Sequence, residues 1–140
     1  MQKKLCTQIS IYKNMEKLKN ILVIIGGVNF LLFGLFHLTF WHGLEWKNEL
    51  VKLTQLNSNV MQMLNIAVTV CLLAFGLIML FYRTEILNTG LGTALLITFA
   101  LFWLARLIGE FAFPGGSTVL GIVLLLCVLI YLIPAVVGKK

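Results

Sequence analysis

Charged residues are scarce in this chain, and aspartate is absent altogether. Charged residues make up 11% of the 140 residues, whereas hydrophobic residues make up 60%; a typical soluble domain has about 25% charged residues. A fold with so few charges cannot cover its surface with polar groups, so the composition excludes an ordinary soluble protein and predicts a surface that faces lipid. The length leaves no room for a separate soluble domain.

Histidine and cysteine are too few and too scattered for the usual metal and redox sites. His37 and His42 lie about 140° apart on one helix, and no other segment has a histidine, which argues against a metal centre or a haem with two axial histidines. Cys6, Cys71 and Cys127 form no Cys-x-x-Cys pair and predict no disulfide framework. We therefore expect no metal and no cofactor.

Four long apolar segments dominate what is present. About 20 apolar residues at about 1.5 Å each cross a hydrocarbon core of about 30 Å. The segments of this length are residues 21–41, 60–82, 91–113 and 118–137. The connections at residues 83–90 and 114–116 are too short to recross the membrane, so each joins antiparallel neighbours. The sequence predicts an all-α membrane protein, with four transmembrane helices in one antiparallel up-down-up-down bundle over residues 20–138.

Basic residues are divided unevenly between the two ends of such a bundle. One end has Lys3, Lys4, Lys13, Lys17, Lys19, Arg83, Lys139 and Lys140, and the other has Lys47, Lys52 and Arg106. Because basic loops stay in the cytoplasm, both termini are expected to be cytoplasmic, with residues 1–19 as a basic cytoplasmic tail. The net charge of +6 then reflects topology, and no nucleic-acid partner is expected.

The first apolar segment is too long for the core of a signal peptide and has no small-residue cleavage pattern after it, so an uncleaved span is expected. Met15 stands just before this span. Residues 1–14 are interpreted as an upstream extension or a disordered tail, with an amphipathic interfacial segment as the alternative. The Lys, Asn and Ile usage is compatible with a bacterial plasma (inner) membrane, and organellar membranes are the alternative.

The connection between the first two segments is the only long one. Leucines recur in it at intervals of three to six residues among polar side chains, a pattern typical of an amphipathic helix at the membrane surface or of a continuation of the first span. We place this interfacial segment at residues 44–57, either shielding the end of the bundle or forming a lid over a cavity. Residues 57–59 are expected to cap the second span.

Three polar residues within the spans are expected at a similar depth. His37 lies about 24 Å along the first helix, Arg106 about 22 Å along the third, and Asn65 about 7 Å into the second. A charged side chain costs about 2.5 to 3.5 kcal/mol at the bilayer midplane, so Arg106 is expected to face the bundle and to have a partner. Glu110, one turn later, is the nearest candidate, and Glu45 or Glu49 in the first connection is the alternative.

These side chains form a candidate ligand site near the outer end of the bundle. If the first helix continues beyond its span, steps of four residues bring His37, Trp41 and Glu45 onto one broad face. The candidate ligand-binding residues are His37, Trp41, Glu45, Asn65, Trp103, Arg106 and Glu110. The alternative is that the tryptophans anchor the chain at the interface and that the Arg106 and Glu110 pair is structural.

Small and polar residues at helical spacing predict the seams between helices. Such a stripe consists of Gln62, Asn65, Thr69 and Gly76 on the second helix, with Gly27 and Gly34 on the first. Small residues let two backbones approach closely in a membrane, and polar ones bond across the seam. These positions are expected to face inward.

The layout, four spans with both ends inside and an arginine late in the third, is similar to that of small bacterial proteins of the DoxX-like families. The resemblance carries over no residue role and no activity. No motif names a reaction, so whether anything is catalysed is left open.

The favoured function is that of an accessory or scaffold protein, with membrane lipid and a second copy or another membrane protein as partners. The alternative is a binding or enzyme module for a quinone or lipid, in which Arg106 holds the head of the ligand and His37 exchanges a proton. A small transporter acting as an oligomer is a further alternative, although the inner half has few polar residues and no interrupted repeat is present.

Overall fold

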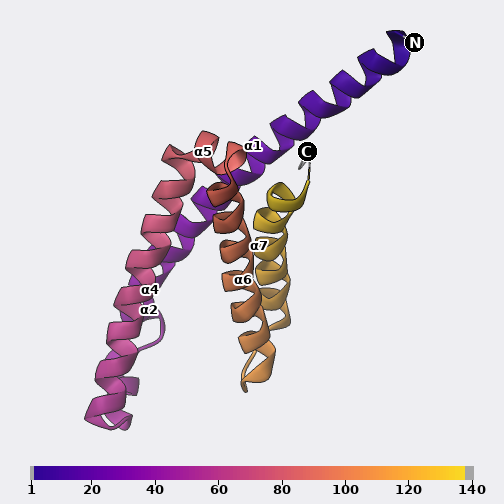
Figure 1. Ribbon diagram of the computed structural model, residues 1–140. Coiled ribbons are helices and arrows are strands. Elements are labelled where there is room, and N and C mark those ends of the chain that lie inside the picture. Colours follow the sequence, from indigo (N-terminus) through magenta and orange to yellow (C-terminus); the bar gives the residue numbers. More distant parts are fainter. Residues whose placement is uncertain (1, 138–140) are drawn as a thin grey trace. The chain divides into compact units, whose positions relative to one another are not determined.

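The computed structural model describes the backbone of residues 2–137 and the side chains of residues 7–137, and this part of the chain is helical without strands. Its long helices are α1 (Gln2–Leu38), α4 (Gln55–Phe81), α6 (Gly90–Ala112) and α7 (Thr118–Val136) (Figure 1). All of them include a stretch long and apolar enough to cross a membrane. The prediction of an all-α, multi-pass membrane protein is confirmed. The side chains of Lys3, Lys4, Cys6, Lys139 and Lys140 lie outside the described part.

The last two long helices match the predicted segments to within one residue, whereas the first two differ. Helix α1 begins at Gln2, so the N-terminal tail is helical, and it ends at Leu38 rather than near residue 41. Helix α4 begins at Gln55, five residues before the predicted start. The Thr54 hydroxyl accepts a hydrogen bond from the amide of Asn57 at 3.3 Å, so the cap lies at Thr54 and the prediction of a cap at residues 57–59 is wrong.

The connection between α1 and α4 is a series of short turns rather than one amphipathic helix. It contains α2 (Phe40–Gly43), α3 (Trp46–Glu49) and the 3-10 helix η1 (Leu50–Lys52). Glu45 has φ of 48°, a left-handed conformation that non-glycine residues rarely adopt. The chain therefore changes direction at this residue, and the prediction that a continuous helix aligns His37, Trp41 and Glu45 is wrong.

The structure forms two compact units. The first unit, residues 27–78, pairs the second half of α1 with α4. Gly76 faces α1 so closely that a Cβ on it would lie 2.8 Å from the Gly27 carbonyl oxygen and 2.7 Å from the Leu31 side chain. A Cβ on Gly34 would likewise lie 2.8 Å from the Leu73 side chain. The glycine seam predicted from the sequence is confirmed within this unit.

The second unit contains the first part of α1, through Gly26, and the chain from Met79 onward. Its helix α5 (Arg83–Asn88) precedes α6, and α6 and α7 pack on each other. The turn between α6 and α7 contains Gly115, whose φ of 91° suits glycine. The side chains that begin these helices also cap them: the Thr89 hydroxyl accepts from Gly92 N at 2.9 Å, and the Ser117 hydroxyl accepts from Leu120 N at 3.4 Å.

Aromatic side chains fill the core of the second unit. The rings of Trp103 and Tyr131 are stacked with centroids 6.5 Å apart, and Phe99 meets Tyr131 edge-on at 5.9 Å. The Tyr131 hydroxyl donates a 2.8 Å hydrogen bond to the carbonyl of Gly26, which joins α7 to α1. Trp103 is only 2% exposed, so its interpretation as an interfacial anchor is wrong.

The Gly76 contact gives a direct test of the α1 and α4 pairing. Changing Gly76→Val should lower the free energy of unfolding by about 1 to 3 kcal/mol, because extra methyl groups would force the two helices apart. Gly90→Ala is the matched control, since nothing lies within 4 Å of a Cβ at Gly90. Both variants are compared with the parent chain by unfolding in detergent micelles. Equal stability of Gly76→Val and Gly90→Ala would contradict the close approach.

Candidate functional site

The seven candidate residues fall into two groups, one in each unit. The first unit contains His37, Trp41, Glu45 and Asn65, and the second contains Trp103, Arg106 and Glu110. In each group two polar side chains bond to each other, His37 with Asn65 and Arg106 with Glu110.

His37 and Asn65 are joined by two hydrogen bonds across the α1 and α4 seam. The His37 Nδ1 atom lies 2.7 Å from the Asn65 Oδ1 atom, and the Asn65 Nδ2 atom donates to the His37 carbonyl oxygen at 3.1 Å. The Asn65 side-chain nitrogen donates to the His37 carbonyl, so the Asn65 side-chain oxygen is the atom that faces the ring. An amide oxygen can only accept, so the His37 Nδ1 atom carries the proton and donates it. In a neutral His37, the Nε2 atom then has no proton and is the hydrogen-bond acceptor of the ring.

The position of His37 at the end of α1 explains why the chain places an asparagine opposite it. Helix α1 ends at Leu38, so the His37 carbonyl is among the last four, which have no partner within the helix. Water cannot satisfy this group in hydrocarbon, and an unpaired backbone carbonyl there costs several kcal/mol. Asn65 therefore completes the end of α1 and fixes the orientation of the imidazole at the same time.

Trp41 and Glu45 do not belong to this pair. Trp41 is 46% exposed and meets the buried Trp46 edge-on, with ring centroids 6.5 Å apart. Glu45 is exposed in the turn where the backbone adopts its left-handed conformation. Within the first unit, the structure thus brings together two of the four predicted residues.

Arg106 and Glu110 form the ion pair that the sequence suggested. The Arg106 Nη1 atom lies 2.9 Å from the Glu110 Oε2 atom, at the i and i+4 spacing that brings side chains together on a helix. The side chain of Glu110 is 8% exposed and that of Arg106 is 50% exposed. The carboxylate is therefore the buried member of the pair, and the arginine side chain is half-exposed.

The second oxygen of Glu110 bonds to the start of the next helix. Glu110 Oε1 accepts a hydrogen bond from the Ser117 backbone amide at 2.8 Å, and Ser117 is the N-cap of α7. The start of a helix favours negative charge because its amide dipoles point their positive ends there. A Cβ at Gly116 would overlap the Glu110 carbonyl oxygen, so the turn needs glycine at this position. Glu110 thus joins the end of α6 to the beginning of α7.

Trp103 lies one turn before Arg106 on α6 but has a different environment. Its ring is stacked on Tyr131 in the aromatic core and is edge-on to Phe102 at 5.4 Å. A buried ring of this kind packs helices rather than lining an open site. Among the described side chains, no three His, Cys, Asp or Glu residues gather as metal ligands would.

Sequence reasoning missed three features. It missed the hydrogen bond from Tyr131 to Gly26, and it counted Lys19 only as a topology signal. Lys19 is 6% exposed and pairs with Glu16 at 2.9 Å. It also missed a groove of about 430 Å³ near Trp41 in the first unit. The tryptophans and amides around this groove were visible in the sequence, but the turns that bring them together were not.

Comparisons with protein-family models, with curated proteins and with solved structures found no match to this chain. The resemblance to the DoxX-like families therefore stays one of layout alone.

Substitutions at Glu110 should separate its two contacts. Glu110→Leu leaves the Ser117 amide and Arg106 without their acceptor, and a lost acceptor for a buried group costs about 1 to 3 kcal/mol. Glu110→Gln keeps an oxygen for Ser117 and loses only the charge, so it should be destabilised less. The control is Glu49→Gln, because Glu49 pairs with Lys52 in an exposed position and such pairs contribute little. Equal unfolding free energies for all three variants would show that Glu110 does not hold the turn.

Proposed function

We propose that this chain is an accessory or scaffold protein of a membrane, in which the polar groups of the spans hold helices together. The observation that carries the proposal is the use of both carboxylate oxygens of Glu110 on protein groups, Arg106 and the Ser117 amide. His37 and Asn65 likewise bond to each other. A general acid or base must instead offer its proton-transfer atom to a substrate.

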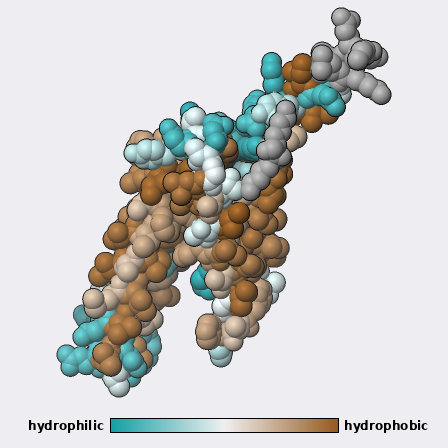
Figure 2. Space-filling model, in the orientation of Figure 1, coloured by the Kyte–Doolittle hydropathy of each residue, from teal (hydrophilic) through white to brown (hydrophobic). Residues whose placement is uncertain are grey.

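The outward surfaces of the helices support the same proposal. In the most apolar stretch of α1, α4, α6 and α7, 28, 22, 28 and 39% of the residues, respectively, are buried. The remaining apolar side chains are available to acyl chains and to the helices of a partner (Figure 2). A second copy of this chain or another membrane protein is the partner that fits such faces.

The proposed orientation has both termini in the cytoplasm and the helices in an up-down-up-down order. The uneven division of basic residues supports this orientation. Within the first unit, α1 and α4 are antiparallel, since His37 meets Asn65 while Gly27 meets Gly76. Their connection would then lie on the outer side. A bacterial plasma membrane is the proposed location.

A binding module for a quinone or lipid is the second candidate function. The observation that favours it is the 50% exposure of the Arg106 side chain. A guanidinium has five N–H donors, and donors beyond the one that meets Glu110 are able to hold an anionic or carbonyl head group.

Native mass spectrometry of gently extracted protein distinguishes the two functions. The scaffold proposal predicts that Arg106→Ala has a lower melting temperature than the parent chain and the same set of bound small molecules. The loss of Arg106 removes a partner of Glu110, which explains the loss of stability. Arg83→Ala is the control for a change of charge outside this pair. A copurifying quinone or lipid that is lost only in Arg106→Ala would overturn the scaffold proposal and support the binding module.

A further inference from the structure

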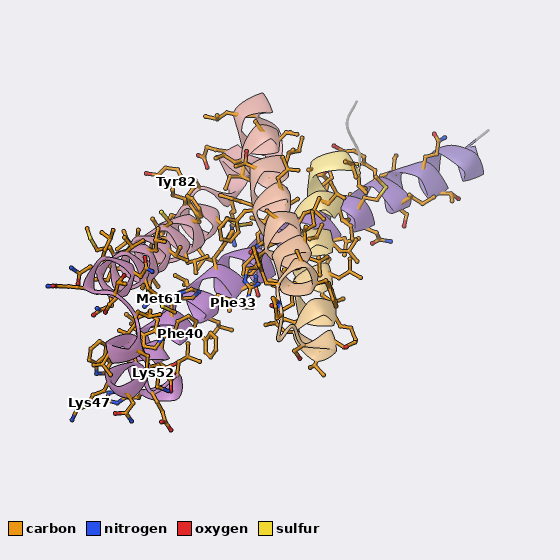
Figure 3. All side chains as sticks on the ribbon, turned by 90° about the horizontal axis from the view of Figure 1, so that it is seen from below. Phe33, Phe40, Lys47, Lys52, Met61 and Tyr82 are labelled. Carbon is orange, nitrogen blue, oxygen red and sulfur yellow. The ribbon has the colours of Figure 1, made fainter. Side chains whose placement is uncertain are left out.

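The groove in the first unit lies where the connection between α1 and α4 meets the first turns of α4. Its volume is about 430 Å³, within the range of about 300 to 1,000 Å³ that is usual for small-molecule sites. The lining residues that matter here are Trp41, Trp46, Lys47, Gln55, Ser58 and Gln62. Figure 3 shows Lys47 at this end of the unit, and hydrophilic side chains gather there in Figure 2.

The walls of the groove combine apolar and polar surface. Trp41 and Val51 are 46% and 78% exposed, so each offers an apolar surface to a ligand. Trp46 is 5% exposed and packs edge-on against Phe40 at 6.0 Å, which gives the groove a fixed aromatic base. Lys47 and the α4 residues Gln55, Ser58 and Gln62, which have amide and hydroxyl groups, also line the groove. A ligand with one polar and one apolar end matches this division.

The charge in the groove comes from Lys47. The other lysine of the connection, Lys52, is neutralised by Glu49 at 2.6 Å. Among the described ion pairs, none includes Lys47. On α4, the Gln62 Nε2 atom donates to the Ser58 carbonyl at 3.2 Å. The groove therefore offers a cation for an anionic group, and tryptophans that are typical of the membrane–water boundary surround it.

We propose that this groove binds the head group of a glycerophospholipid. The ammonium group of Lys47 holds the phosphodiester, because a charge-assisted hydrogen bond to phosphate is stronger than one between neutral groups. The side chains of Gln55 and Ser58 bond to the glycerol and ester oxygens. Trp41 and Val51 lie along the first part of the acyl chains. The proposed site shares no residue with the Arg106 and Glu110 pair, so it goes beyond the scaffold proposal and stands without it.

The test compares Lys47→Gln with Lys52→Gln in the full chain. Both variants lose one exposed lysine of the same connection, but only Lys47 lines the groove. Each is reconstituted in nanodiscs of phosphatidylglycerol and phosphatidylcholine, and the fraction that keeps one phospholipid is measured by native mass spectrometry. Lys47→Gln should bind phospholipid about fivefold more weakly, the effect of about one lysine near a membrane surface. Lys52→Gln should match the parent chain.

Circular dichroism melting of both variants checks that they keep the fold of the parent chain. A difference in phospholipid retention between folded variants then reflects the groove and not stability. A further variant, Trp41→Ala, should also reduce phospholipid retention, because it removes apolar surface and leaves the charge in place. Diacylglycerol, which lacks the phosphate, serves as the competitor. Equal phospholipid retention by Lys47→Gln and Lys52→Gln, or displacement of the phospholipid by diacylglycerol, would overturn the proposal.

Discussion

A polar group inside hydrocarbon must find its partner within the protein, and the described structure depends on this constraint. The buried carboxylate of Glu110 bonds to Arg106 and to the backbone amide of Ser117, the N-cap of α7. The open carbonyl at the end of α1 is satisfied by Asn65, which also holds the imidazole of His37. Each polar cluster lies where a helix ends, because helix ends are where a backbone has groups left to satisfy. The polar residues of the spans therefore satisfy backbone groups near the places where the chain turns.

Between these ends the helices are held by close packing. Lipid is as apolar as leucine, so helices in a bilayer gain little from burying apolar surface and depend on contact instead. Gly76 allows α4 to reach the backbone of α1, and Gly26 allows the Tyr131 ring to come close enough for its hydroxyl to bond to the Gly26 carbonyl. The stacked rings of Trp103 and Tyr131 fill the space between α6 and α7. Adding a single methyl group at such a contact should lower the stability of the helix pair, whereas the same change at a lipid-facing residue should not.

The sequence predicted the spans well because their length and composition depend on the bilayer alone. It also predicted the pairing of Arg106 with Glu110 and the glycine seam, which follow from helical spacing. It failed where local turn geometry decides the outcome. Helix α1 ends at Leu38 and Glu45 is left-handed, so the assumed continuation of α1 through Glu45 does not form. The cap at Thr54 starts α4 five residues earlier than expected. Trp103 was misjudged because a tryptophan near the end of a span packs equally well at the interface or in a core, and only the partner ring on α7 decides between them.

The most direct test is solid-state NMR of the full chain in lipid bilayers, with labelled histidine, asparagine, arginine and glutamate. The structure predicts a through-space contact between the His37 Nδ1 atom and the Asn65 side-chain carbonyl carbon, and another between the Arg106 guanidinium nitrogen and the Glu110 carboxylate carbon. Both contacts should be present without any added ligand. Their absence in bilayers, or their appearance only when a quinone is added, would contradict the claim that these residues are used to join helices.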